Sequence, residues 1–202
     1  MFVQKGGLTL INALPSWNSQ GVLPPVDPSD PVSSSRSPYA VSLKDFVSQF
    51  GTSTDRLNIL SGLLSFRSAL HAAGIIGGFQ WLDGSFLENI ESLESRPPRD
   101  IDVVTFYYLP PNQTQRTLLN GYPQLFDRRY IKNNYHVDAY FIDLKGIVPE
   151  KLISKTAYWY GVWSHQRNSL LWKGYLQIDL SSTDDHIALD NLIRMMDKGG
   201  AP

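Results

Sequence analysis

Residues 81–104 read WLDGSFLENIESLESRPPRDIDVV, and this segment is the most informative part of the sequence for predicting the fold. The aromatic segment GGFQWL runs into Asp83, which is typical of a β-strand that ends in a tight turn. Apolar residues then recur at helical spacing from Phe86 to Leu93. After a proline-containing loop, IDVVTFYY (residues 101–108) is β-branched and aromatic, which predicts a second strand. Gly84 and Ser85 should therefore lie at a strand-to-helix turn.

The flanking segments predict the rest of the architecture. Leucines at steps of three and four indicate a helix over residues 54–73, and HVDAYFIDL (136–144) indicates a third strand. Further patterns predict helices over 112–120, 149–163 and 184–198 and a strand over 171–180. We therefore predict an α/β (α+β) fold, a small mixed β-sheet flanked by helices.

The domain organisation follows from composition. Residues 1–52 are rich in proline and serine, so we predict an extended N-terminal arm. Its apolar residues should pack on the domain: Leu8, Leu10, Ile11, Leu14 and Trp17. Residues 53–146 form the core, and residues 147–202 form a C-terminal strand-helix extension of the same domain.

Composition also limits the kinds of site and partner. The 202 residues include no cysteine, which excludes disulfides and thiolate zinc sites and leaves Mg²⁺ or Mn²⁺ as the expected metal. There is neither a long apolar run nor a secretory signal, so we expect a soluble, cytoplasmic protein without a membrane partner. The net charge of −1 gives no general reason to bind nucleic acid. Acidic residues dominate from Asp83 to Asp102, and basic residues dominate from Arg128 to Lys173. This distribution fits an acidic metal site that faces a basic phosphate-binding surface, and it equally fits two solvent-exposed surfaces with scattered charges.

Asp100 and Asp102 are the first candidate metal ligands. They are two residues apart at the mouth of a strand, so both carboxylates project from one face and can share a cation. Magnesium accepts one or two carboxylates and completes its shell with water and phosphate oxygens. The alternative is that both aspartates form ion pairs with Arg96 and Arg99.

Two further elements complete the candidate site. The Gly84-Ser85 turn offers a hydroxyl and free backbone N–H groups to a phosphate, or Ser85 is an ordinary N-cap. Asp138 lies within an apolar strand, where a carboxylate is costly to bury without a metal or a partner. The partner, in the alternative, is Lys132 or Arg129.

These residues carry a resemblance. WLDGSFLENIESLESRPPRDIDVV resembles the signature of the polymerase-beta-type nucleotidyltransferase superfamily, and HVDAYFI resembles its third-carboxylate strand. The resemblance implies that Gly84 and Ser85 contact the triphosphate of an NTP, that Asp100 and Asp102 bind two metal ions, and that Asp138 binds the catalytic one. The 14 residues between Ser85 and Asp100 form a longer loop than in minimal members. GVLPP and SHQRNSLLWKGYLQIDL resemble a poorly characterised prokaryotic group of stand-alone nucleotidyltransferase-like proteins, which supports the fold and gives no substrate.

The segment from Tyr158 to Lys173 places aromatic residues beside bases, a composition suited to stacking a nucleobase and pairing phosphates. We expect Arg167 and Lys173 to contact the nucleotide or the acceptor. Alternatively, His165 belongs to an aromatic core edge and the two bases are solvated.

The expected function is a magnesium-dependent transfer of an NMP from an NTP to a protein, RNA or nucleotide acceptor. A toxin-antitoxin or phage-defence setting, with a partner protein from a neighbouring gene, fits this class. The alternative is a catalytically silent module that binds a nucleotide or a partner within a two-protein complex.

Overall fold

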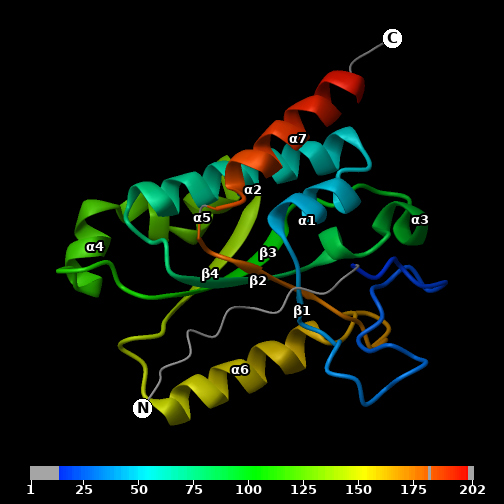
Figure 1. Ribbon diagram of the computed structural model, residues 1–202, viewed down its shortest axis with the longest axis horizontal. Helices are drawn as coiled ribbons and strands as arrows, with labels where there is room; N and C mark the ends of the chain where they lie inside the picture. The colour runs from blue at the N-terminus through cyan, green and yellow to red at the C-terminus, as the bar shows by residue number, and fades with distance from the viewer. Residues whose placement is uncertain (1–13, 182, 200–202) are drawn as a thin grey trace.

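The structure, a computed structural model, describes residues 14–181 and 183–199 (Figure 1). The expected packing of Leu8, Leu10 and Ile11 lies outside these residues. Leu14 and Trp17 lie within them, and both pack against the hydrophobic core. Within the described residues, no helix combines the length and hydropathy needed to cross a bilayer.

A five-stranded mixed sheet forms the centre of the fold, in the order β1-β5-β2-β3-β4. The strands are β1 (Tyr39–Ala40), β2 (Gly78–Asp83), β3 (Ile101–Tyr107), β4 (Val137–Asp143) and β5 (Leu176–Asp179). Strand β2 runs antiparallel to both β3 and β5, whereas β4 is parallel to β3 and β1 is parallel to β5. The predicted mixed sheet is confirmed.

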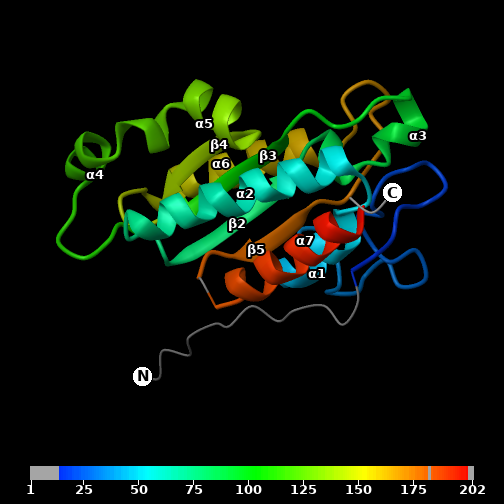
Figure 2. The same ribbon diagram turned by 90° about the horizontal axis from the view of Figure 1, so that it is seen from above.

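Helices cover both faces of this sheet. They are α1 (Leu43–Phe50), α2 (Thr54–Ala72), α3 (Ile90–Glu94), α4 (Gln115–Gly121), α5 (Arg128–Tyr135), α6 (Pro149–Trp163) and α7 (Asp185–Gly199), with 3₁₀ turns η1 (Ser85–Leu87) and η2 (Pro123–Phe126). Figures 1 and 2 show α1, α2 and α7 on one side of the sheet and α6 on the other. The α/β class predicted from the sequence is therefore the class observed.

Helix α2 is the main support of the sheet. The side chain of Ser53 caps its first turn by accepting from the backbone N–H of Arg56. Its apolar stripe is fully buried at Leu60, Leu63 and Leu70. This stripe aligns α2 over the strands that carry the candidate site.

The structure corrects the sequence prediction in two places. The region 1–52 is more than an extended arm, because it supplies α1 and the edge strand β1. The single helix expected from Phe86 to Leu93 is broken into η1 and α3, with Glu88 in an extended conformation between them. The cause of this break is a buried arginine described below.

Candidate active site

The turn after β2 needs a glycine. Gly84 has φ +90° and ψ −174°, a region that residues with a side chain avoid. A Cβ built on Gly84 would lie 2.2 Å from Oδ2 of Asp102, because Asp83 and Asp102 face each other across β2 and β3. The glycine therefore lets the carboxylate of Asp102 lie directly against the turn, with Ser85 beside it.

A fully buried arginine holds the loop that follows this turn. Arg56 donates from Nη1 to the carbonyl of Phe86 and from Nη2 to the carbonyl of Glu88, both at 2.6 Å. Its Nε forms an ion pair with Glu91 at 2.7 Å, and its guanidinium lies 5.1 Å from the ring centroid of Trp17. Arg56 thus satisfies these two carbonyls outside a helix, and the N–H of Asn89 donates to the carbonyl of Gly21, so the helix is interrupted.

The three predicted carboxylates lie close together at one end of β3 and β4. Asp102 and Asp138 are register partners on these parallel strands, and Asp100 immediately precedes β3. Nζ of Lys132 lies 2.6 Å from Oδ2 of Asp100 and 3.2 Å from Oδ2 of Asp138. Arg128 makes a two-pronged ion pair with Asp138, one prong being Nη2 to Oδ2 at 2.8 Å. The three carboxylates are therefore neighbours at this end of the sheet, together with two cations from α5.

Charge compensation is uneven across the acid cluster, which we define as Asp100, Asp102 and Asp138. Burial and the nearby charges of the other two acids raise the pKa of Asp102 to about 6. Burial also pushes the pKa of Asp138 upward, but hydrogen bonds from Arg128 and Lys132 outweigh it and hold that pKa below its usual range. In the described part of the chain, no basic side chain is within ion-pairing distance of Asp102. Lys132 and Lys173 oppose the rise in the pKa of Asp102 only from a distance, so Asp102 is the least compensated of the three acids.

A second ion network lies under the turn and is buried. Nζ of Lys173, whose residue is 3% exposed, lies 3.0 Å from Oδ1 of Asp83 and 2.8 Å from Oε1 of Glu88. Burial raises the pKa of Asp83 to about 7, with Lys173 opposing that rise. The predicted contact between Lys173 and a nucleotide would compete with these two carboxylates, so the geometry gives the ammonium a positioning role.

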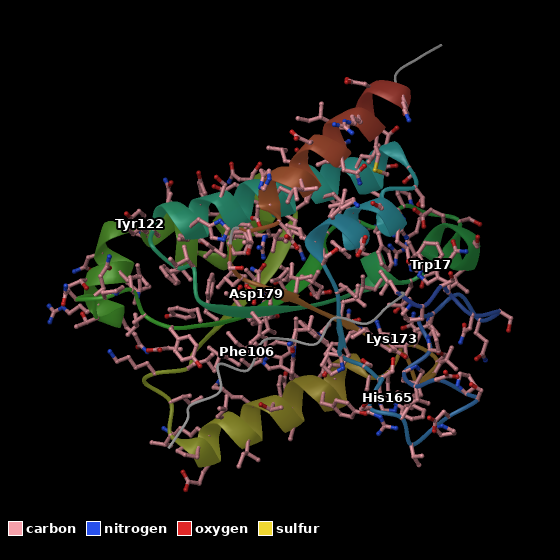
Figure 3. All side chains as sticks on the ribbon, viewed as in Figure 1. Trp17, Phe106, Tyr122, His165, Lys173 and Asp179 are labelled. Carbon is pink, nitrogen blue, oxygen red and sulfur yellow. The ribbon has the colours of Figure 1, made fainter. Side chains whose placement is uncertain are left out.

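One cleft of about 740 Å³ joins these parts. All the sequence-predicted site residues line it: Gly84, Ser85, Asp100, Asp102, Asp138, Arg167 and Lys173. Aromatic rings from β4 and α6 form another part of the wall, with the centroids of Tyr140 and Trp159 4.5 Å apart. Arg167 is exposed on this wall. Figure 3 shows Trp17, Lys173 and His165 at the same end of the molecule, opposite Tyr122.

Comparison with known proteins identifies the family. One family model matches residues 15–179, which is more than half of the chain. The chain belongs to DUF6932, a family of unknown function. The part of this DUF6932 chain that matches the model contains every residue we predicted for the site. Searches of the curated proteins and of the solved structures found no match.

The acid cluster in this DUF6932 protein is held by cations. Among the described residues, no group of three or more acidic or histidine side chains is arranged to hold one metal ion. Arg128 and Lys132 draw two of the three carboxylates toward α5. The donors nevertheless suit a hard cation, because carboxylate oxygens are the preferred ligands of magnesium and one carboxylate, Asp102, has no cationic partner in the described part.

Sequence patterns did not assign Arg128, Asp83 and Glu88 to this site, and they offered Lys132 only as an alternative partner of Asp138. Arg128 and Lys132 are four residues apart, so both lie on one face of α5 and can reach the same acids. Glu88 and Asp83 flank the Gly-Ser turn, so a buried base had to neutralise them. Of the pairings considered for Asp138, that with Lys132 is present, and Arg128 takes the place considered for Arg129.

Proposed function

We propose that the chain is a magnesium-dependent nucleotidyltransferase of the polymerase-beta type, which moves an NMP from an NTP to an acceptor. One observation carries the proposal: Asp100, Asp102 and Asp138 converge beside the Gly84-Ser85 turn in a single cleft. The resemblance of residues 81–104 to that superfamily supports it independently, because it was drawn from the order of motifs along the chain.

The acid cluster is the proposed metal-binding part of the site. Magnesium, when bound there, would neutralise phosphate charge and lower the pKa of the attacking hydroxyl. Burial, followed by the charges of Asp100 and Asp138, raises the pKa of Asp102, and a bound cation would favour its ionised form. The side chains of Arg128 and Lys132 are about half exposed, so water can solvate them when magnesium takes their place on the carboxylates.

The rest of the cleft suits the nucleotide. The hydroxyl of Ser85 and the backbone around Gly84 would bind phosphate oxygens, and Arg167 would pair with a phosphate from the opposite wall. The aromatic rings of Tyr140, Tyr158 and Trp159 offer apolar surface for a base. In this scheme Lys173 positions the turn through Asp83 and Glu88.

One incubation tests the proposal. The protein is mixed with α-labelled NTPs, magnesium and a cell lysate, and labelled acceptor and pyrophosphate are measured. We expect release of pyrophosphate and a labelled protein, RNA or nucleotide, and we expect Asp100→Asn and Asp102→Asn to abolish both. Undiminished transfer by either variant would refute the assignment. The identity of the labelled acceptor also tests the toxin-antitoxin or defence setting and reveals any partner protein.

A second candidate is a catalytically silent nucleotide-binding module. It is favoured by one observation, that Arg128 and Lys132 already neutralise two acids of the cluster. This function predicts that NTP binds with the same affinity with and without magnesium and that no pyrophosphate is released. The same incubation therefore separates the two candidates.

A further inference from the structure

A second hollow of about 670 Å³ adjoins the cleft. It is lined by Ser85, Arg96, Arg99, Asp100, Lys132, Asn133 and His136. Four of these also line the cleft: Ser85, Arg96, Asp100 and Lys132. A ligand that fills the cleft can therefore extend into the hollow past Ser85 and the acid cluster.

The lining of this hollow is cationic. It contains three bases and one carboxylate, together with the amide of Asn133 and the imidazole of His136. No hydrogen bond or ion pair joins the side chain of Arg99 to another described residue. Arg96 is paired with Glu94 at 2.7 Å, but both side chains are more than one third exposed, so this pair is weak. The hollow therefore has donors and positive charge available to an anion.

The walls of the hollow are fixed to the sheet. The loop after α3 begins at Ser95 in the left-handed conformation, with φ +52°, and continues through Pro97 and buried Pro98. His136 closes α5, also in the left-handed conformation, and its carbonyl accepts from the N–H of Ile101 at 3.0 Å. The prolines and this backbone hydrogen bond thus fix the backbone of the two walls relative to each other, so only side chains need to be ordered when an anion binds.

We propose that this hollow is a phosphate subsite, in which Arg96 and Arg99 bind a phosphate group beyond the acid cluster. The inference rests on the proposed function in that the phosphate belongs to one of its substrates. The carrier is either the NTP, through its terminal phosphate, or a phosphorylated acceptor. The paired and forked donors of arginine suit a phosphate in both cases. These two arginines come from the long loop between Ser85 and Asp100.

The test uses inorganic phosphate with the full chain, in EDTA and at low ionic strength. Titration should shift the imidazole NMR signals of His136 and leave those of exposed His186 in place. The double variant Arg96→Gln/Arg99→Gln should weaken phosphate binding at least about tenfold, since charge-assisted hydrogen bonds are lost. Arg116→Gln makes the same kind of charge change in α4, at the opposite end of the molecule from α3 (Figures 1 and 2). It should change the affinity less than about twofold.

The proposed subsite would be refuted if the wild type does not bind phosphate or if the double variant binds it as tightly as the wild type. It would also be refuted if Arg116→Gln weakens phosphate binding as much as the double variant does. A repeat with magnesium in place of EDTA and with saturating ATP identifies the carrier: loss of the phosphate signal assigns the subsite to the NTP, and persistence assigns it to the acceptor. The titration in EDTA needs no magnesium, so Asp102→Asn should still bind phosphate. Phosphate binding without any nucleotidyl transfer would leave the subsite standing while the proposed enzyme fails.

Discussion

Replacing Asp102 by asparagine should stabilise the metal-free protein at neutral pH. Asp102 is largely buried beside two other acids, and its pKa is raised from 3.8 to about 6. Its charge therefore opposes folding. Asparagine has nearly the same shape and carries no charge, so the substitution removes the repulsion without opening a cavity.

The magnitude and the pH dependence follow from the pKa. One pKa unit corresponds to about 1.4 kcal/mol, so the charge of Asp102 lowers the free energy of unfolding by about 3 kcal/mol at most. Between pH 4 and pH 6 the folded chain keeps a proton that the unfolded chain has lost, so wild-type stability falls as pH rises through this window. The gain from Asp102→Asn should be absent below pH 4 and reach about 1–3 kcal/mol above pH 6.

The measurement is urea denaturation from pH 4 to pH 8, with and without magnesium. Asp190→Asn is the matched control, because Asp190 is exposed on α7 and such changes are usually within about 0.5 kcal/mol. Magnesium should stabilise the wild type by mass action and leave Asp102→Asn unchanged. If Asp102→Asn is less stable than the wild type at pH 7, the charge of Asp102 does not oppose folding. If magnesium stabilises both proteins equally, Asp102 is not a metal ligand.

Three further substitutions test the surroundings of the turn. Gly84→Ala should lower the free energy of unfolding by about 1–3 kcal/mol. The control Gly161→Ala, where a Cβ meets open space on α6, should raise it by up to about 1 kcal/mol. Similar urea midpoints for the two variants would contradict this prediction. Arg56→Met should lower the free energy of unfolding by about 3–5 kcal/mol, because it leaves the carboxylate of Glu91 and two carbonyls unpaired. An unchanged melting temperature would show that Arg56 does not hold the loop. Lys173→Met should lower the free energy of unfolding more at pH 8 than at pH 5. Burial raises the pKa of Asp83 to about 7, and below that pH the protonated acid no longer needs a neighbouring ammonium group. Equal losses of stability at both pH values would refute this.

Local patterns predicted most of the sheet and helices. Apolar spacing correctly placed strands β2, β3 and β4 and helices α2, α6 and α7, because each pattern reflects one buried face. Strand β1 could not be predicted, since Tyr39 and Ala40 form a strand only through pairing with Leu176 and Gln177, far along the chain. Pairing over such a distance leaves no local period in the sequence.

The interrupted helix after Ser85 shows a different limit. Its residues have helical spacing, and the competing interaction comes from Arg56 in α2 and Trp17 in the N-terminal region, whose Nε1 donates to the carbonyl of Leu87 at 2.7 Å. The spacing of acids and the Gly-Ser pair sufficed to place the candidate site in one cleft. The cations that accompany those acids were harder to assign, because a base reaches its partner through the fold.

Burial separates the cations around the turn into two kinds. Lys173 and Arg56 are at most 4% exposed in their side chains, and removing a buried partner costs about 3–5 kcal/mol, so these two residues act as fixed supports of the turn. The side chains of Lys132 and Arg128 are 46% and 54% exposed, so water can solvate these two cations even though the carboxylates that they contact are mostly buried. Only Lys132 and Arg128 could therefore give way to the cation or phosphate that we propose. Both residues contact the acid cluster, so the cations that water can solvate lie where the proposed ligands would bind.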